Sequence, residues 1–197
     1  MHFLKLRPFV EDNIDNLDWN GLSANPNAIH LLEAYPHKIN WRWLSSNKNA
    51  IHILEKNIDK IAWSVLSRNR NAIELLKRYP DKIDWEYFSA NPNAIYFLEQ
   101  NRDKIDWINL SENPNAIHLL GFNIEYVNWY HLSKNPNAII ILGRNIELIC
   151  WTALSRNPKG IELLEQHQDK IDWYAISVNP SIFYKSKHIK SANKIYK

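Results

Sequence analysis

Apolar and polar residues recur along this chain in a unit of 22 residues that is marked by tryptophan. Counted from its Trp as repeat position 1, the unit reads W-x-x-L-S-x-N-P-N-A-I-x-L-L-E-x-N-x-D-K-I-D. Repetition at a fixed period of this size is typical of solenoids and related repeat architectures. The tryptophans that set the period are Trp19, Trp41, Trp63, Trp85, Trp107, Trp129, Trp151 and Trp173.

The second half of each unit predicts one short helix. Ala at repeat position 10, Ile at 11 and Leu at 13 and 14 share one helix face. Asn fills position 7 in every unit and Pro follows it in six, which predicts an Asn N-cap with Pro as the first helical residue. Asn at position 17 is expected to end this helix of about nine residues in the left-handed conformation. The asparagines at position 7 are Asn25, Asn47, Asn69, Asn91, Asn113, Asn135, Asn157 and Asn179.

A second helix is predicted to begin at each tryptophan. Trp at position 1 and Leu at position 4 share a face, and position 22 before the Trp is Asp or Asn in five units, as expected of an N-cap. Those caps are Asn40, Asp84, Asp106, Asn128 and Asp172. Alternatively, this helix begins earlier, near position 18, where Pro36 and Pro80 lie.

These patterns predict an all-α fold, a right-handed α-solenoid of short helix pairs with about eight 22-residue repeats. The leucine-rich repeat has a similar period. We reject it because positions 10 to 14 have helical spacing, and because Pro after Asn favours helix starts over asparagine ladders. We expect residues 1–18 to form an N-terminal half-repeat cap, residues 19–180 the solenoid, and residues 181–197 a basic C-terminal cap or tail.

Stability of such short helices has to come from stacking. A helix of about nine residues is unstable alone, so the tryptophans and leucines are expected to lie inside a core shared between layers. The ends are then expected to differ from the middle, and in the last unit Lys185 and Ser186 replace the two leucines. This replacement predicts a polar end face.

Composition excludes several classes of protein. The single Cys150 excludes an internal disulfide and a multi-cysteine zinc site, and four glycines leave no phosphate-binding Gly-rich loop. No apolar run is long enough to span a membrane, and residues 1–10 lack the apolar core of a secretory signal. We expect no cofactor, no bound metal and no membrane partner, in a protein that is not secreted.

The net charge of +3 is a property of the C-terminal tail. Residues 181–197 contain five Lys and no acidic residue, which leaves 19 basic and 21 acidic residues and a charge of −2 on the rest. A protein that follows a phosphate backbone needs a basic stripe along its body, and this body has none. The tail itself is interpreted as a solvated capping segment; binding to nucleic acid, an acidic protein or a membrane surface is the alternative.

The repeated phrase N-P-N-A-I-x-L-L-E-x-N-x-D-K-I-D-W, best seen in residues 91–107, resembles tandem-repeat proteins that large DNA viruses of amoebae and algae encode in many copies. The resemblance covers residues 8–180 and implies an origin, and with it a location in host cytoplasm or virion. It implies no chemistry, because the family has no established activity. The chain departs from the phrase at Lys48, Arg70, Lys159 and Gly160.

Three residue types that recur at fixed repeat positions, Trp, Ser and His, could form chemical sites. The tryptophans could form a stacking platform for bases or sugars, but their helical spacing with Leu favours packing. Serine recurs at position 5 without a matching His and acid, so backbone hydrogen bonding is expected instead of nucleophilic catalysis. His30, His52 and His118 share position 12, yet layers about 10 Å apart separate them too far to share a metal. Cys150 is expected to be half-buried and inert.

The residues that vary between units are more informative. Glu at position 15 and Lys at position 20 are both lost in units five and six, which suggests that these two positions face each other. Several positions that are usually polar become apolar there, and we predict that they bind a partner on units four to six, centred on Phe122 and Tyr126. The alternative is local repacking, in which Tyr126 covers Gly121 and Leu148 covers Gly143. The candidate residues are Tyr96, Ile108, Phe122, Tyr126, Tyr130, Ile140 and Leu148.

The function that these observations favour is a non-enzymatic scaffold for protein–protein interaction, with the variable positions 2, 3, 6, 12 and 16 on a constant frame. The alternative is a repeat protein that binds single-stranded nucleic acid, one layer to each nucleotide. We predict no catalytic residues, because no set of residues breaks the repeat and converges on one site.

Overall fold

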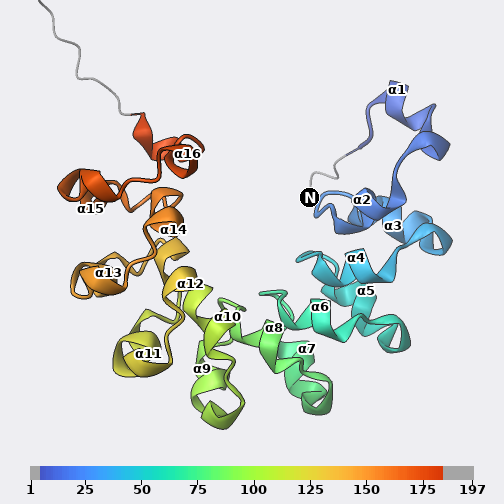
Figure 1. Cartoon of the computed structure of the whole chain (residues 1–197). Coiled ribbons are helices and arrows are strands. Elements are labelled where there is room, and N and C mark those ends of the chain that lie inside the picture. Colours follow the sequence, from blue (N-terminus) through green and yellow to red (C-terminus); the bar gives the residue numbers. More distant parts are fainter. Residues whose placement is uncertain (1–4, 184–197) are drawn as a thin grey trace, which may run out of the picture.

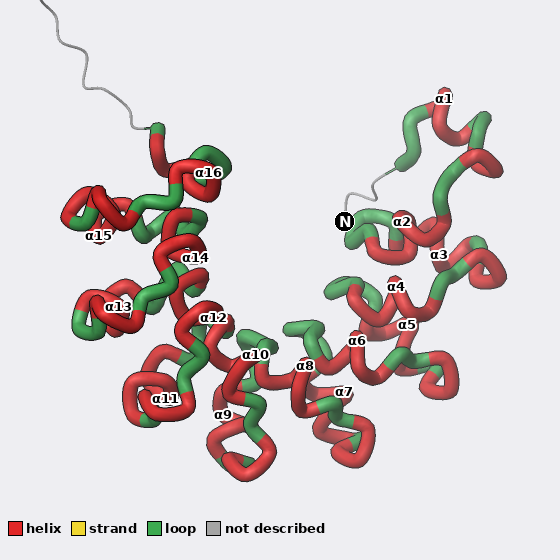
Figure 2. Tube along the Cα trace, viewed as in Figure 1, coloured by secondary structure: helices red, strands yellow, loops and turns green. Residues whose placement is uncertain are grey.

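The structure, a computed structural model, describes residues 5–183, and every regular element in this range is a helix (Figure 2). Each of the seven full repeats contributes two α-helices and one short 3-10 helix, and consecutive repeats stack in the same order along the chain. The prediction of an all-α solenoid is therefore confirmed. The predictions for Lys185, Ser186 and the lysine-rich tail from residue 184 onward fall outside the described residues.

The helices form two rows, seen in Figure 1 as the inner and outer sides of an open arc. The inner row begins at the tryptophans: α2 (Trp19–Ala24), α4 (Trp41–Ser46), α6 (Trp63–Ser67), α8 (Trp85–Ser89), α10 (Trp107–Glu112), α12 (Trp129–Lys134), α14 (Trp151–Ser155) and α16 (Trp173–Ile176). The outer row is α3 (Ile29–Ala34), α5 (Ile51–Glu55), α7 (Ile73–Arg78), α9 (Ile95–Glu99), α11 (Ile117–Phe122), α13 (Ile139–Gly143) and α15 (Ile161–Gln166).

Short 3-10 helices return the chain from the outer row to the inner row. They occupy repeat positions 18 to 20, so the alternative of a helix start near Pro36 and Pro80 is realised as a separate element. They are η1 (Ile14–Asn16), η2 (Pro36–Lys38), η3 (Ile58–Lys60), η4 (Pro80–Lys82), η5 (Arg102–Lys104), η6 (Ile124–Tyr126), η7 (Ile146–Leu148), η8 (Gln168–Lys170) and, after the last Asn-Pro, η9 (Pro180–Ile182).

The inner helices start where the sequence predicts. Position 22 precedes the Trp in an extended conformation, and its side chain accepts a backbone N–H of the first turn; Asp84 Oδ1, for example, accepts from Tyr87 N at 3.3 Å. The same bond is made by Asn40, Asp106, Asn128 and Asp172. Neighbouring inner helices pack side by side, as expected for the row on the inside of the curve.

The core lies between the two rows and is built from leucine and alanine. Leu at positions 4 and 14 and Ala at position 10 are fully buried in almost every repeat. The tryptophans pack against this core from its edge: seven are half-buried, and Trp173 in the last layer is 70% exposed. The prediction that the tryptophans pack with leucine is therefore confirmed for seven of them, but they lie at the edge of the core and not at its centre. Aliphatic side chains of the neighbouring layers already fill the space between the rows.

The outer helices begin three residues later than predicted. The first α-helical residue is Ile at position 11, and Asn at position 7 instead opens a turn in which Ala28 N donates to Asn25 O at 3.0 Å. Pro at position 8 supplies the φ angle that the second residue of such a turn requires. The Asn N-cap interpretation is wrong for the outer helix. The asparagine side chain still accepts a hydrogen bond from a nearby backbone N–H, because Asn25 Oδ1 bonds to Asn27 N at 3.0 Å.

The amide groups of the position-7 asparagines form a ladder between layers. Asn91 Nδ2 donates to the carbonyl oxygens of Ser67 and Asn69 in the preceding repeat, both at 2.9 Å. The same pair of bonds is made by every position-7 asparagine from Asn47 to Asn179. These side chains are buried. Rejecting an asparagine ladder was therefore wrong: here the ladder joins helical turns and needs no β-strands.

Two further sets of bonds reinforce the ladder. Asn at position 9 donates to the carbonyl of position 8 in the preceding repeat, as Asn93 does to Arg70 O at 2.9 Å. Ser at position 5 is buried and connects two segments of its own repeat: Ser89 Oγ donates to Trp85 O at 2.8 Å and accepts from Asp106 N at 2.9 Å. The expectation of backbone hydrogen bonding for these serines is confirmed.

Asparagine at position 17 ends the outer helix by a different route from the predicted one. Its φ is near −135°, as in Asn57 and Asn101, and within residues 5–183 no residue has a positive φ. The side chain donates back to the carbonyl four residues earlier, at 2.9 Å from Asn57 Nδ2 to Ile53 O. The left-handed cap is therefore a wrong prediction, and a side-chain bond satisfies the helix end instead.

Candidate binding surfaces

The inner row presents its variable residues away from the core. Successive helical residues turn by about 100°, so positions 2, 3 and 6 lie opposite the core-facing positions 1, 4 and 5. Five large apolar side chains at positions 2 and 3 of the inner helices are exposed; one of them, Tyr174, lies on the terminal helix α16, and the other four lie on helices between α4 and α12. We call these four residues the inner-row patch: Trp43 on α4, Tyr87 on α8, Ile108 on α10 and Tyr130 on α12.

A shallow pocket of about 330 Å³ opens beside this patch. Its lining comes from three successive inner helices and the ladder: Ser46, Val65, Arg68, Asn69 and Tyr87. The pocket combines an apolar wall, a tyrosine ring and a guanidinium group. Such a mixture is suited to a side chain with an apolar stem and an acidic or hydroxyl end.

Charged residues on the inner row are predominantly basic. Glu112 on α10 is already engaged, 3.4 Å from His131 Nδ1 and 3.6 Å from Lys134 Nζ on α12. By contrast, Arg42, Arg68 and Arg156 are exposed, and no ion pair joins them to an acidic side chain within residues 5–183. The inner row therefore offers free guanidinium groups beside aromatic rings.

The seven residues of the predicted patch are all exposed, but the structure divides them among three places. Ile108 and Tyr130 belong to the inner row, whereas Tyr96, Phe122 and Ile140 lie on the outer helices α9, α11 and α13. Phe122 is the most exposed of these, at 86%. Tyr126 and Leu148 lie in the 3-10 helices η6 and η7.

The residue at position 20 covers the tryptophan of its own repeat. Lys60 Nζ lies 4.7 Å from the centre of the Trp41 ring and Lys104 Nζ lies 4.8 Å from that of Trp85. In repeat five the ring of Tyr126 replaces the ammonium group and stacks on Trp107 at 5.1 Å and 25°. Tyr126 therefore packs on a tryptophan, and the space beside Gly121 is instead closest to Ile141 of the next layer.

The suggested contact between positions 15 and 20 is wrong. Glutamates at position 15 pair across to the next layer instead, as Glu33 does with His52 at 2.9 Å and Glu99 with His118 at 2.7 Å. Both histidines lie at the surface, as predicted.

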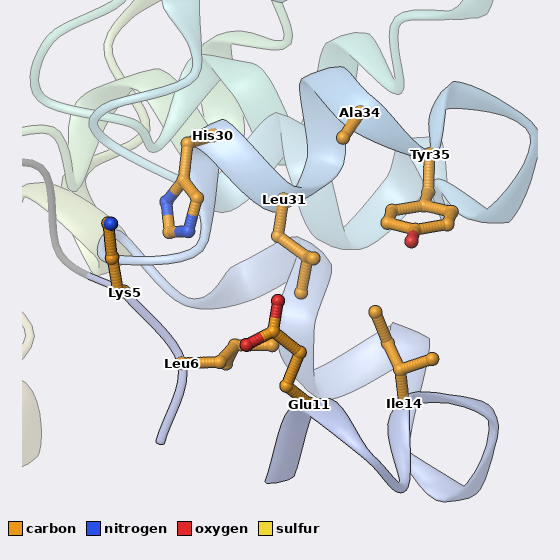
Figure 3. Close-up of a pocket in the computed structure, with 8 residues that line it drawn as sticks. All are labelled: Lys5, Leu6, Glu11, Ile14, His30, Leu31, Ala34 and Tyr35. Atoms are coloured by element: carbon orange, nitrogen blue, oxygen red, sulfur yellow. The ribbon is translucent and has the colours of Figure 1, made fainter. Parts of the chain in front are cut away.

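The N-terminal half-repeat covers the first outer helix and leaves an open pocket of about 450 Å³ (Figure 3). Leu6, Ile14 and Leu31 and the ring of Tyr35 form its apolar walls, and Glu11 lies at its side. The half-repeat is joined to the first repeat by Lys38, whose Nζ is 2.7 Å from Asp15 Oδ1. This bond lowers the pKa of Asp15 below its ordinary value.

No three His, Cys, Asp or Glu side chains between residues 5 and 183 come together as metal ligands. Cys150 is half-buried at position 22, and its backbone N–H donates to Ser133 Oγ at 3.0 Å. The pKa of Asp172 is lowered because its carboxylate accepts hydrogen bonds from Ala175 N and from the Thr152 hydroxyl.

No protein-family model, curated protein or solved structure matches this chain. Among residues 5–183, no helix has the length and apolar character needed to cross a bilayer. The interpretation of the two surfaces therefore rests on their own chemistry. Sequence reasoning missed Trp43 and Tyr87, although Trp43 is the only Trp outside the 22-residue series.

Proposed function

We propose that this chain is a non-enzymatic scaffold that binds an extended acidic protein segment along its inner row. The observation that carries the proposal is the inner-row patch: Trp43, Tyr87, Ile108 and Tyr130 are exposed on a row whose arginines form no ion pair within residues 5–183. Trp, Tyr and Arg are the residue types that contribute most to binding energy at protein interfaces. The partner expected from this chemistry carries Asp or Glu next to apolar side chains.

The architecture supports this assignment. The ladder and the core use positions 4, 5, 7, 10 and 14, so substitutions at positions 2, 3 and 6 leave the frame unchanged. Inner helices in contact bring equivalent positions within about 8–10 Å of one another, a spacing that an extended chain spans with about three residues. A partner in the polyproline II conformation, which has three residues per turn and rises about 3.1 Å per residue, can thus contact successive layers with every third side chain.

A single-stranded nucleic acid is the second candidate, because aromatic rings beside arginine also bind bases. Three observations favour protein. Val65 and Ile108 interrupt the row with aliphatic side chains, Glu86 and Glu112 place carboxylates on the same face, and residues 1–180 carry a net charge of −2. A phosphate backbone carries a charge at every nucleotide and would meet repulsion at each acidic layer. A protein segment can instead place its few carboxylates opposite the arginines alone.

The origin and location remain proposals of the same kind. The resemblance of the repeat phrase to tandem-repeat proteins of large DNA viruses supports a viral protein in host cytoplasm or virion. The partner would then be a host or virion protein.

A displayed library of random peptides, selected on the immobilised full chain, tests the proposal. We expect selected peptides to be rich in Asp and Glu with aromatic or aliphatic neighbours. Their affinity, measured by calorimetry, should fall at least about tenfold in the variant Tyr87→Ser/Tyr130→Ser, since each lost ring costs on the order of 1–2 kcal/mol.

The matched control is Tyr96→Ser/Phe122→Ser, which removes two equally large exposed rings from the outer row. It should change the affinity less than about twofold. A larger loss in this control than in Tyr87→Ser/Tyr130→Ser would move the binding surface to the outer row, where Phe122 of the predicted patch lies. If filter binding gives tight association with oligo(dT), and if this binding weakens steeply with salt, the nucleic-acid candidate replaces the protein one.

A further inference from the structure

The two ends of the solenoid carry complementary parts of a single repeat. At the N-terminus, residues 5–18 occupy repeat positions 9 to 22 and precede the first tryptophan. At the C-terminus, residues 173–180 occupy positions 1 to 8 of a repeat whose outer helix is not among the described residues. The described C-terminal residues continue to residue 183, at position 11, so the two ends together contain all 22 positions of one repeat, with positions 9 to 11 present at both ends.

The N-terminal part already has the geometry of the second half of a repeat. Asn13 at position 17 donates to Phe9 O at 2.9 Å, the bond that Asn57 and Asn101 make in the interior. η1 (Ile14–Asn16) corresponds to the 3-10 helix of the standard unit. Asp18 caps α2 by accepting the N–H groups of Asn20 and Gly21. Among the described residues, this end therefore lacks an inner helix and the turn that carries the ladder.

The C-terminal part supplies those missing elements. α16 (Trp173–Ile176) is a standard inner helix, and Asn179 continues the ladder onto Ser155 O and Asn157 O at 2.9 Å. Ser177 Oγ donates to Trp173 O at 2.7 Å, as in every other repeat. The residues at positions 1, 5 and 7 are thus already in their standard conformation.

Hydrogen-bonding groups at the two ends are unpaired in a matching way. Within residues 5–183, Asn25 Nδ2 and the backbone N–H of Asp18 have no acceptor, whereas the same groups in later repeats bond to positions 5 and 7. At the other end, Ser177 O accepts no bond from a described residue, and Ser177 Oγ lacks the backbone donor that Ser155 Oγ receives from Asp172 N. The unpaired donors therefore lie at the N-terminal end of the solenoid, and the unpaired acceptors lie at its C-terminal end.

Large apolar side chains at the two ends are also exposed where their counterparts in interior repeats are covered. Interior tryptophans are covered by positions 17 to 20 of their own repeat, whereas Trp173 has no such cover among residues 5–183 and is 70% exposed. Phe9, at the core position 13, is 68% exposed, whereas Leu75 and Leu119 at that position are buried. Each exposed ring is one that the other end of the chain would cover.

We infer that copies of this chain associate head to tail, with α16 of one copy and the N-terminal half-repeat of the next completing one 22-residue repeat. Asn25 Nδ2 would donate to Ser177 O and Asn179 O of the second copy, and the Asp18 N–H to its Ser177 Oγ. The ring of Trp173 would pack beneath η1. The interface joins two different surfaces and is heterologous, so the arc of Figure 1 extends into a filament or closes into a ring. The end faces lie outside the inner-row patch on α4 to α12, and the inference is independent of the proposed binding function.

Sedimentation velocity of the full chain across a concentration series tests this inference. The wild type should show species larger than the monomer, growing in size with concentration, and negative-stain images should show curved assemblies. Phe9→Asp and Trp173→Asp each place a carboxylate on one end face and should each keep the chain monomeric. Both side chains are exposed in the single copy, so circular dichroism should show unchanged helix content.

Mixing the two variants gives the decisive measurement. Phe9→Asp retains an intact C-terminal face and Trp173→Asp an intact N-terminal face, so an equimolar mixture should form a one-to-one dimer that cannot grow further. Phe122→Asp, which changes an equally exposed ring far from either end, should assemble like the wild type.

Three results would overturn the inference. The first is a wild type that stays monomeric at the highest attainable concentration. The second is a mixture of Phe9→Asp and Trp173→Asp that remains monomeric although the wild type assembles. The third is assembly that persists in either end variant or is abolished by Phe122→Asp, because association would then use another surface.

Discussion

In each layer, the edge that carries the asparagine ladder keeps its residues and bonds constant, whereas the edge that carries the tryptophan varies. At the ladder edge, repeat positions 5 and 7 keep the same residue in all eight repeats, and from the second repeat onward each buried asparagine makes the same two bonds to its neighbour. At the tryptophan edge the partner of the ring changes: Tyr79 lies against Trp63, Lys104 over Trp85 and Tyr126 against Trp107. A ring at the edge accepts any flat or cationic neighbour, whereas two buried carbonyl groups require a donor pair of one size and direction.

This difference separates the parts of the unit that can vary from those that cannot. Buried hydrogen-bond partners must be replaced as a set, since a single loss leaves polar groups unsatisfied. Half-buried rings lose only part of their contact when a neighbour changes. Variation without loss of the fold is therefore confined to the tryptophan edge and to the exposed positions of the two rows.

The largest effect is expected from Asn91→Asp at the ladder edge. The carboxylate would lie against Ser67 O and Asn69 O with no proton to donate, in a site that is fully buried. The free energy of unfolding should fall by about 4 kcal/mol or more, from two lost bonds and a buried charge. Urea denaturation followed by circular dichroism measures the change.

Asn25→Asp provides the matched control, because Asn25 occupies the same repeat position in the first layer. It is exposed, and its Nδ2 has no acceptor within residues 5–183. In the monomer its free energy of unfolding should change by less than about 0.5 kcal/mol. A loss equal to that of Asn91→Asp would mean that the ladder bonds do not account for the invariance of position 7.

A smaller effect is expected from Lys104→Ala at the tryptophan edge. Removing the ammonium group from the face of Trp85 should reduce the free energy of unfolding by about 0.5–1 kcal/mol. Lys104→Tyr should stay within about 0.5 kcal/mol of the wild type, because Tyr126 fills the same position in repeat five. If the tyrosine variant loses as much as the alanine variant, the tryptophan edge is as specific as the ladder edge.

The smallest effect concerns the helix cap of the last layer. The pKa of Asp172 is lowered by the N–H of Ala175 and the hydroxyl of Thr152, so its carboxylate stabilises the fold above its ordinary pKa of 3.8, and this contribution is lost as the pH falls through the lower folded value. Asp172→Asn should match the wild type in melting temperature at neutral pH, because Asn40 and Asn128 are caps at the same position.

Melting curves recorded from neutral pH to below 3.8 measure the effect. The wild type should lose slightly more stability than Asp172→Asn on acidification, since only the carboxylate titrates. Identical acid profiles would show that the charge of the Asp172 cap does not stabilise the fold.

Local pattern determined the secondary structure of this protein. The 22-residue spacing of tryptophan, the helical spacing of Ala, Ile and Leu, and the caps at position 22 predicted two helices per unit and the stacking of units. Each of these features acts over a few residues along the chain. The exposed Phe122 and the surface histidines could also be predicted, because they lie at positions that the core does not use.

Tertiary structure alone decided the roles of asparagine and tryptophan. An asparagine followed by proline offers the same side chain to a helix start and to the carbonyl groups of a neighbouring layer, and the acceptors of Asn91 lie 22 and 24 residues away. Whether an indole is central or peripheral depends on how far apart the two rows lie, which leucine packing sets. The curvature of the stack puts the row that carries Ile108 and Tyr130 on the inside of the arc and the row that carries Phe122 on the outside. Side-chain packing between layers sets this curvature, because it determines the angle from one layer to the next.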